Sequence, residues 1–225
     1  MVDFHSHILP EIDDGSASVE MSLEMLRKES SQGVHTVIAT PHFYASEHTP
    51  GQFLAGRQEA AERLRKAAEL GLPRVLLGAE VAYFRGMSES EALWDLRIAD
   101  TNYILVELPM PPWNDRVYEE LGDLRAKQNL LPIVAHVDRY LPPFMGDRMV
   151  ERLLEKGVLL QANTSFFLGK RAKRARRMLR EGTIHLLGSD CHDLSSRPPN
   201  LGGLVLEEEA LDHIRYHQQL VLDEG

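Results

Sequence analysis

The sequence lacks the features that would direct a protein out of the cell, into a membrane or onto nucleic acid. It has one cysteine, Cys191, so no disulfide can form within the chain, and this favours a reducing compartment. No apolar run approaches the roughly 18 residues of a membrane span, and the N-terminus has neither the basic segment nor the apolar stretch of a secretion signal. Acidic residues number 34 against 25 basic ones, for a net charge of −9, whereas nucleic-acid binding rests on positive charge. We therefore expect a cytoplasmic protein that neither inserts into a membrane nor binds nucleic acid.

No linker, low-complexity stretch or change of composition divides the chain. At 225 residues, a compact fold buries roughly 70% of the surface that the unfolded chain exposes, so one core can stabilise it. We therefore expect a single domain over residues 1–225.

A short apolar run of β-prone residues followed by a longer helical pattern recurs along the chain. Most of these runs are unbroken rather than alternating, which is typical of parallel strands covered on both faces. This order predicts a closed or nearly closed β/α barrel, with a doubly wound open sheet as the alternative. No Gly-x-Gly-x-x-Gly follows the first strand, which weakens a nucleotide-binding version of the open sheet. The expected strands are 2–5, 36–39, 75–78, 103–106, 132–135, 158–162 and 184–188, and the expected helices include 16–32, 58–70, 149–156 and 171–181, each followed by a glycine.

Six of the seven expected strands end in a histidine or a carboxylate. The C-terminal edge of the strands is where barrel enzymes carry their chemistry. His5 and His7 are two positions apart, so their side chains point to one side of a strand, and Asp190 and His192 repeat this spacing. The residues at these strand ends are His5, His7, Asp13, Asp14, His42, Glu80, Glu107, His136, Asp190 and His192.

Each of these residues alone has an ordinary explanation, because a histidine at a strand end is more often structural and a carboxylate there often caps the next helix. Five histidines and four carboxylates, with Asp13 left aside, meeting at one edge would, however, repel one another and be poorly solvated unless a cation held them. Imidazole and carboxylate ligands suit Mn, Fe, Zn or Mg, so the pattern predicts a metal centre. The remaining histidines are expected to be structural: His35, His48, His185, His213 and His217.

Several motifs occur in order over nearly the whole chain: Phe4-His5-Ser6-His7-Ile8-Leu9-Pro10, Asp13-Asp14-Gly15, Ala39-Thr40-Pro41-His42, Gly78-Ala79-Glu80, Ala135-His136-Val137-Asp138-Arg139-Tyr140, Ser189-Asp190-Cys191-His192 and Arg197-Pro198-Pro199. Together they resemble the PHP (polymerase and histidinol phosphatase) superfamily, and within it the bacterial manganese-dependent protein-tyrosine phosphatases of the CpsB/YwqE type, which act in capsule and exopolysaccharide systems. The resemblance implies a distorted (β/α)7 TIM-like barrel of the PHP type with three divalent metals, Mn2+ first and Fe, Zn or Mg as alternatives. It also implies a phosphotyrosine protein as the substrate, such as the tail of a bacterial tyrosine kinase, and leaves the oligomeric state open.

The resemblance further assigns roles to individual residues. A metal-bridging hydroxide would attack phosphorus in line without a phosphoenzyme, while Arg139 and Arg197 would hold the substrate phosphate. A tyrosyl leaving group has a pKa near 10 and has little need of a general acid, for which Asp193 and His48 are the weak candidates. The implied ligands are His5, His7, Glu80 and Asp190 for the first metal; Asp14, His42 and His192 for the second, with Asp13 a less favoured neighbour; and Glu107 and His136 for the third, with Glu80 as a bridge.

Three other functions compete with this interpretation. Cys191 and Arg197 have the Cys-x5-Arg spacing of thiolate tyrosine phosphatases. Asp190 and Asp193 flank that thiol, however, and would raise its pKa and repel a phosphate dianion. A small-molecule phosphatase such as histidinol-phosphate phosphatase shares the metal chemistry, but Glu107, where other PHP proteins often have histidine, favours the tyrosine-phosphatase branch. A metal-stabilised interaction module, like those attached to polymerases, typically loses ligands that are all present here.

One segment has no part in the metal chemistry. Residues 170–180 hold seven basic side chains and no acidic one, which leaves 18 basic against 34 acidic residues in the rest of the chain. The segment is either a solvated helix face or a dock for the acidic or phosphorylated tail of a partner kinase, with nucleic-acid binding a weaker option. The seven residues are Lys170, Arg171, Lys173, Arg174, Arg176, Arg177 and Arg180.

Overall fold

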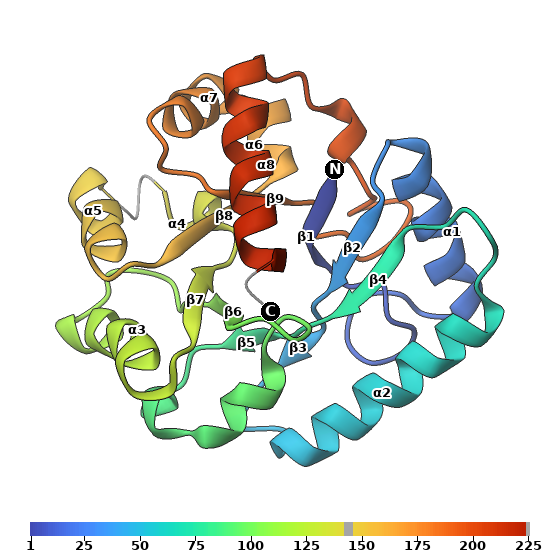
Figure 1. The fold of residues 1–225 in the computed structure, drawn as a ribbon, viewed down its shortest axis with the longest axis horizontal. Coiled ribbons are helices and arrows are strands. Elements are labelled where there is room, and N and C mark those ends of the chain that lie inside the picture. The colour runs from blue at the N-terminus through green and yellow to red at the C-terminus, as the bar shows by residue number, and fades with distance from the viewer. Residues whose placement is uncertain (142–145, 224–225) are drawn as a thin grey trace.

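In the computed structural model, which describes residues 1–141 and 146–223, the chain forms a curled parallel sheet surrounded by helices (Figure 1). The strands pair in the orders β1-β2-β4 and β3-β5-β6-β7-β8-β9, and every pair is parallel. The predicted α/β barrel type is therefore confirmed. The strands are β1 Val2–Ser6, β2 Thr36–Ala39, β3 His42–Phe43, β4 Arg74–Leu77, β5 Glu80–Ala82, β6 Tyr103–Glu107, β7 Leu131–Val134, β8 Leu159–Asn163 and β9 Leu186–Gly188.

Backbone hydrogen bonds join the two groups of strands. The N–H of Asp190 donates to the C=O of His5 at 2.7 Å, which places the end of β9 beside β1. On the other side, the chain itself continues across two residues from β2 into β3 and from β4 into β5. The first and last strands of the chain are thus neighbours, as a barrel requires.

Two of the seven expected strands, confirmed as β2 and β4, are each followed by a second short strand that was not expected. The strand at 36–39 resumes as β3 after Thr40 and Pro41, and the strand near 75–78 resumes as β5 after a break of two residues. Pro41 has no N–H to continue the ladder of hydrogen bonds. Because β3 and β5 pair through His42 and Glu80, these two candidate ligands begin short strands, whereas the sequence predicted that they follow the ends of long ones.

The expected helices at 16–32, 149–156 and 171–181 are confirmed as α1, α5 and α7, with small shifts of their ends. The expected helix at 58–70 was wrong at both ends. It begins at Pro50 because Thr49 and Gln52 form a capping box and proline suits the first turn, and it ends at Ala67, before Gly71. The helices are α1 Val19–Ser31, α2 Pro50–Ala67, α3 Asp115–Gln128, α4 Val137–Tyr140, α5 Asp147–Glu155, α6 Thr164–Leu168, α7 Ala172–Arg180 and α8 Glu208–Asp223, with 3₁₀ turns at Met87–Glu89, Glu91–Leu96 and Leu201–Gly203. No helix in the described part of the chain is both long and apolar enough to cross a membrane.

Apolar side chains fill the barrel and the space between the sheet and its helices. One buried cluster contains Phe4, Ile38, Leu105, Ile133 and Leu186, which come from five different strands. Because these strands lie on different sides of the curled sheet, the cluster occupies the interior of the barrel. Two further clusters pack helices against the outside of the sheet.

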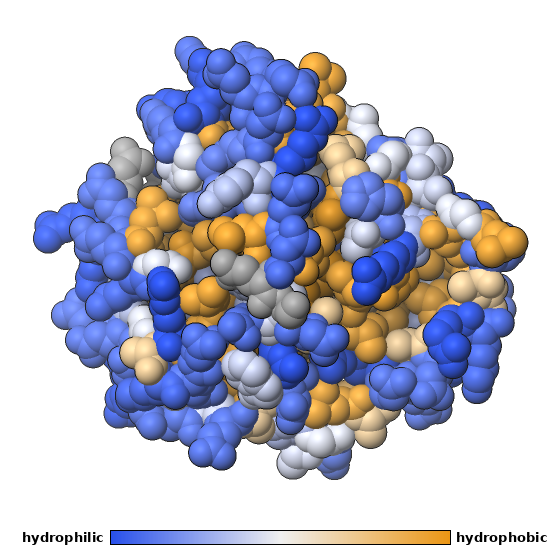
Figure 2. Space-filling model, viewed as in Figure 1, coloured by the Kyte–Doolittle hydropathy of each residue, from blue (hydrophilic) through white to orange (hydrophobic). Residues whose placement is uncertain are grey.

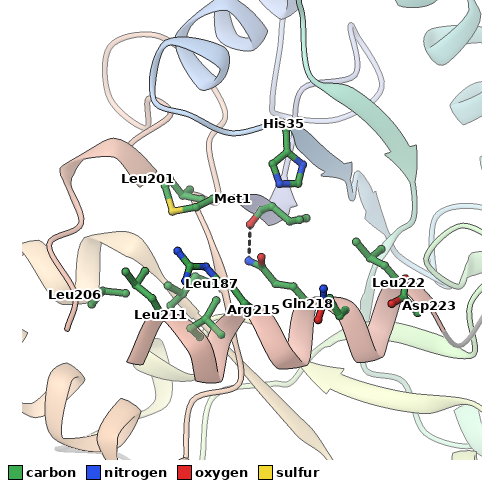
Figure 3. Close-up of a pocket in the computed structure, with 13 residues that line it drawn as sticks. Met1, His35, Leu187, Leu201, Leu206, Leu211, Arg215, Gln218, Leu222 and Asp223 are labelled. Atoms are coloured by element: carbon green, nitrogen blue, oxygen red, sulfur yellow. Dashed lines mark hydrogen bonds between the residues drawn. The ribbon is translucent and has the colours of Figure 1, made fainter. Parts of the chain in front are cut away.

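An apolar hollow of about 390 Å³ lies at the N-terminal end of the barrel, between α8 and the start of β1 (Figure 3). Leu187 and Ile214 line it, and the side chain of Gln218 donates to the C=O of Val2 at 3.2 Å. Apolar residues are visible beside α8 on this face of the molecule (Figure 2). The candidate ligands lie at the opposite ends of the strands, where barrel enzymes act, so the hollow is not the catalytic site.

Candidate metal centre

Four side chains from β1, β5 and the end of β9 converge in the first group. Nε2 of His5 lies 3.2 Å from Nε2 of His7 and 3.1 Å from Oε2 of Glu80, and Nε2 of His7 lies 3.3 Å from the same oxygen. Oδ1 of Asp190 lies 3.6 Å and 3.5 Å from the two nitrogens. A divalent ion with bonds of about 2.1 Å holds neighbouring ligand atoms about 3.0–3.4 Å apart. The spacing therefore fits the ligand set expected for the first metal.

Three further side chains form a second group beside the first. Oδ1 of Asp14 lies 3.5 Å from Nε2 of His42 and 3.3 Å from Nε2 of His192. The rings of His7 and His192 pack with their centroids 3.8 Å apart, so the two groups adjoin. Ligand atoms of His7, Asp14, His42 and His192 all lie within 4.8 Å of one another. The structure thus brings together the residues expected for the second metal.

The third group is built around the other oxygen of Glu80. Nε2 of His136 lies 2.8 Å from Oε1 of Glu80 and 3.3 Å from Oε1 of Glu107. Nδ1 of His42 lies 3.0 Å from Oε2 of Glu80. Glu80 therefore stands between all three groups, which is the position that a bridging carboxylate needs.

Several buried polar atoms that face this centre have close neighbours but no hydrogen bond of good geometry. They include Nδ1 of His42, Oε2 of Glu80 and Nε2 of His192. An unsatisfied buried polar atom costs about 1–3 kcal/mol, and coordination by a cation would remove that cost. The donor atoms are imidazole nitrogens and carboxylate oxygens with no thiolate, a set that suits Mn, Fe, Zn or Mg. The residues present fit a centre of divalent metals.

The charges of the cluster stabilise one another. Burial lowers the pKa of His7, but its contact with Asp13 and those with other carboxylates outweigh burial and hold that pKa well above its usual value. Burial also opposes the charge on His136, yet Glu107 and Glu80 raise its pKa to about 9. Burial would raise the pKa of Glu80, but the surrounding histidines hold it well below the usual range. The negative charge that holds protons on these imidazoles is the charge that would attract metal ions.

The backbone around the ligands is tight and strained. A Cβ atom at Gly15 would lie 2.3 Å from the carbonyl oxygen of His7, and one at Gly188 would lie 2.6 Å from Cβ of His5, so both positions require glycine. His136 and Asp190 have left-handed backbones with φ of 33° and 54°. This conformation costs a residue with a side chain on the order of 1–3 kcal/mol and clusters at functional sites.

Two polar residues hold the histidines from behind. Nδ1 of His7 donates to Oδ2 of Asp13 at 2.7 Å, which leaves Nε2 to face the centre. Oε1 of Gln161 lies 3.2 Å from Nδ1 of His5 and accepts the backbone N–H of His136 at 2.6 Å. Asp13 therefore orients a ligand instead of standing among the ligand atoms. Such partners fix the tautomer and direction of a metal-binding imidazole.

Sequence reasoning missed the roles of Gln161 and Asn163, which lie on β8, the one of the seven expected strands that is not followed by a histidine or carboxylate. Nδ2 of Asn163 donates to Oδ2 of Asp190 at 2.8 Å, and Nε2 of Gln161 donates to Oδ1 of Asn163 at 3.2 Å. Their two-residue spacing places both amides on the same side of the strand, but this spacing alone does not separate them from structural polar residues. β8 thus supports the ligands of its neighbours.

Two arginines stand at the edge of the centre. Arg139 donates through Nη2 to Oδ2 of Asp190, and its Nη1 lies 3.6 Å from Oε1 of Glu107. Nη2 of Arg197 donates to Oδ1 of Asp190 at 2.8 Å. Both side chains are more than a third exposed. Because a guanidinium has five N–H donors, each arginine keeps donors available toward the open side of the centre.

Cys191 is unsuited to act as a nucleophile. The side chain is fully buried, and burial together with Asp3 and Glu29 raises the pKa of its thiol well above the ordinary value. A thiolate nucleophile needs a lowered pKa and access to its substrate. The geometry therefore argues against the Cys-x5-Arg alternative.

The two candidates for a general acid differ in their surroundings. The carboxylate of Asp193 accepts hydrogen bonds from Ser196 and Ser195, and these lower its pKa, so it stays ionised and has no proton to give. His48 is exposed and lines a hollow of about 340 Å³ together with His42. Asp193 holds a turn, and His48 shares a hollow with the candidate ligand His42.

Comparisons with known proteins identify a family and relatives of this chain. The model of the family described as "Capsular polysaccharide synthesis, CpsB/CapC" matches residues 1–220. The tyrosine-protein phosphatase YwqE of Bacillus subtilis is 31% identical over 210 residues, which are 88% of this chain and 79% of that protein. The tyrosine-protein phosphatase CpsB of Streptococcus pneumoniae is 28% identical over 214 residues, or 88% of this chain and 86% of that protein.

A solved structure from the same group of phosphatases also matches this chain. A crystal structure from a study of YwqE of Bacillus subtilis and CpsB of Streptococcus pneumoniae, described as unique metal-dependent tyrosine phosphatases, superposes with a TM-score of 0.76 at 26% identity. That match covers 100% of this chain and 88% of the other. The phosphotriesterase homology protein of Escherichia coli, with a TM-score of 0.53 at 11% identity and 97% of both chains covered, shares the fold alone.

Proposed function

The chain belongs to the CpsB/CapC family of capsular polysaccharide synthesis, and from this we propose that it is a metal-dependent protein-tyrosine phosphatase of the CpsB/YwqE type. The observation that carries the proposal is the convergence of nine side chains whose ligand atoms lie 2.8–3.6 Å from their neighbours. The nine are His5, His7, Asp14, His42, Glu80, Glu107, His136, Asp190 and His192. The substrate class is phosphotyrosine in a protein, for which the tail of a bacterial tyrosine kinase of exopolysaccharide synthesis is our candidate.

The nine side chains would hold three divalent ions, and we propose Mn2+ as the metal. When bound, the ions would supply an activated water as nucleophile and neutralise the charge that builds up on the phosphoryl oxygens. Three divalent ions against the four carboxylates leave a net charge of about +2 at the centre. A phosphate dianion is therefore attracted to the site although the protein as a whole carries a net charge of −9.

The other residues of the site bind and orient. Arg139 and Arg197 are placed to donate to phosphate oxygens from the open side, and charge-assisted hydrogen bonds from a guanidinium are among the stronger ones. Their contacts with Asp190 hold both guanidinium groups at the rim before substrate arrives. Gln161 and Asp13 keep the ligating nitrogens pointed at the metals. The burial of His5 and Glu80 limits the access of bulk water to the reacting groups.

Activity on defined substrates tests this proposal. Protein loaded with Mn2+ should hydrolyse a phosphotyrosine peptide with a kcat/KM at least tenfold above that for histidinol phosphate, and a chelator should abolish both reactions. A Cys191→Ser variant should retain the wild-type rate within about threefold, because the buried thiol takes no part. Metal analysis of the same samples should find close to three ions per chain. Activity that survives the chelator but not the Cys191 change would refute the proposal, and a preference for histidinol phosphate would reassign the substrate.

A further inference from the structure

Three exposed basic side chains form one line along α7. Lys173, Arg176 and Arg180 are spaced by three and four residues, so they share a face of the helix. All three are exposed, and within residues 1–141 and 146–223 none of them forms an ion pair. We call these three residues the α7 stripe. The surface over α7 is mostly hydrophilic in Figure 2.

The α7 stripe contrasts in charge with the rest of the molecule. Residues 170–180 carry seven basic side chains and no acidic one, whereas the rest of the chain has 18 basic and 34 acidic residues. A solvated helix face with no docking role normally mixes both signs, since ion pairs three or four residues apart stabilise it. Away from the metal centre, an acidic chain would meet mostly acidic surface, and residues 170–180 are a segment that would attract it. Nucleic acid would meet the same repulsion with a higher density of charge.

A hollow beside the stripe offers room for side chains. It measures about 340 Å³ and is lined by Arg176 and Arg180 together with apolar groups of the segment before α8. Val205 in that segment is 81% exposed, and Glu207 is the one acidic residue among the lining residues. The combination of two guanidinium groups with apolar walls suits an acidic peptide that also carries apolar side chains.

The basic segment begins at the edge of the metal centre. Nη1 of Arg171 donates to the backbone C=O of Asp138 at 2.8 Å, and Asp138 directly precedes Arg139. From residue 173 to residue 180 the helix advances about 10 Å, and an extended peptide covers that length with about three residues. A peptide that passes Arg171 as it leaves the metal centre would therefore lie along the whole stripe with about three further residues.

We propose that the α7 stripe docks an acidic segment that flanks the phosphotyrosine of the substrate protein. This inference rests on the proposed phosphatase function and adds the sequence context that the enzyme selects. The stripe accelerates capture of the acidic substrate through electrostatic attraction, so its effect lies in KM and falls with salt. It takes no part in the chemical step.

A charge-reversal pair with a matched control tests the docking. The variant R176E/R180E changes the stripe, and R65E/K66E makes the same change of charge on exposed residues of α2, far along the chain from the stripe. The probe is a fluorescent peptide with a central tyrosine among glutamates, not phosphorylated, followed by anisotropy at 50 mM salt. We expect R176E/R180E to weaken binding at least tenfold and R65E/K66E less than twofold. With a phosphorylated form of the peptide, KM should rise tenfold at unchanged kcat.

Further measurements separate docking from folding and from the phosphatase function. Hydrolysis of p-nitrophenyl phosphate, which is too small to reach the stripe, should be the same within twofold in all three proteins and shows that the variants fold. R176Q/R180Q should lie between wild type and R176E/R180E. Equal peptide binding by all three proteins, or tighter binding of a single-stranded RNA than of the peptide, would overturn the proposal. If no phosphate ester is hydrolysed, the phosphatase proposal fails while the anisotropy still decides the docking.

Discussion

The molecule has two clusters of histidines, at opposite ends of its barrel. Five histidines lie among the carboxylates of the metal centre, at the C-terminal ends of the strands. His185, His213 and His217 lie together at the other end, where α8 packs against the start of β9, with ring centroids 4.4–6.1 Å apart. Both clusters are closely packed, so the number of imidazoles does not distinguish them.

What surrounds the rings does distinguish the two clusters. In the described part of the chain no carboxylate pairs with His185, His213 or His217, and burial, with the other two rings nearby, lowers the pKa of His185 to about 3. Their hydrogen bonds go to the backbone: Nδ1 of His185 accepts the N–H of Leu160 at 3.0 Å, and Nε2 of His213 donates to the C=O of Ile184 at 2.9 Å. Burial among other imidazoles therefore keeps an imidazole neutral, and carboxylates turn a histidine cluster into a cation site.

The largest expected effect separates these clusters directly. Glu80→Gln removes the one carboxylate that touches all three ligand groups, and we expect kcat/KM for p-nitrophenyl phosphate to fall at least a thousandfold, with loss of bound metal. His213→Gln in the other cluster should change kcat/KM less than twofold, because its ring bonds only to the backbone. Steady-state kinetics and metal analysis on both variants check this. A large loss of kcat/KM in His213→Gln would mean that the two ends of the barrel are coupled.

A second pair of variants asks how much the supporting residues contribute. Gln161→Leu keeps the volume of the side chain but removes the oxygen that faces Nδ1 of His5. Partners behind a metal-binding histidine are worth about 10–100-fold in metal affinity, so we expect Mn2+ affinity by titration calorimetry to fall by about that factor. Gln218→Leu is the matched control, since this buried glutamine donates to the backbone of Val2 at the opposite end. The control should lower thermal stability and leave Mn2+ affinity unchanged; equal losses of affinity would contradict an orienting role.

The contrast between ligands and supporters also explains what sequence reasoning could find. His5, Glu80 and Asp190 could be predicted because charged or metal-binding residue types recur where expected strands end. Gln161 could not, because an uncharged amide on a strand resembles any structural polar residue until β8 is known to lie between β7 and β9. The sequence predicted that His185 is a structural residue. It could not predict that His185 packs against His213 and His217 of α8, because that contact depends on tertiary packing.

The errors in the fold have equally local causes. Apolar runs located all seven strands, since each run is bounded by polar or turn-forming residues. β3 and β5 are only two and three residues long, and no periodicity can be read in so few positions. The start of α2 was missed because the apolar pattern begins later than the capping box of Thr49 and Gln52 that starts the helix. Capping residues, unlike apolar periodicity, mark a helix end with single side chains.

A buried carboxyl group without imidazoles extends the comparison to the pH dependence of stability. Glu29 is fully buried, and burial together with the carboxylate of Asp3 raises its pKa to about 10, from 4.5 in the unfolded chain. Between these values the folded protein holds a proton that the unfolded chain releases, so this group lowers stability as pH rises, by up to about 1.4 kcal/mol per pH unit. Glutamine stays neutral in both states, and Glu29→Gln should therefore unfold at higher urea concentration than wild type at pH 9, with a smaller difference at pH 5.

The opposite change of stability with pH is expected for a buried carboxylate that has a cation beside it. Glu120 is 5% exposed, and although burial would raise its pKa, Arg116 and the backbone N–H of Gly86 lower it. Its contribution to stability is present above pH 4.5 and is lost as pH falls through the lowered folded pKa. Glu120→Gln should therefore lower the urea midpoint at pH 7 and differ less from wild type near pH 3. Urea titrations across this pH range should show Glu29→Gln more stable than wild type, and Glu120→Gln less stable than wild type, at neutral to alkaline pH. If both shifted the same way, the neighbours of a buried carboxyl group would not be what decides its charge in this fold.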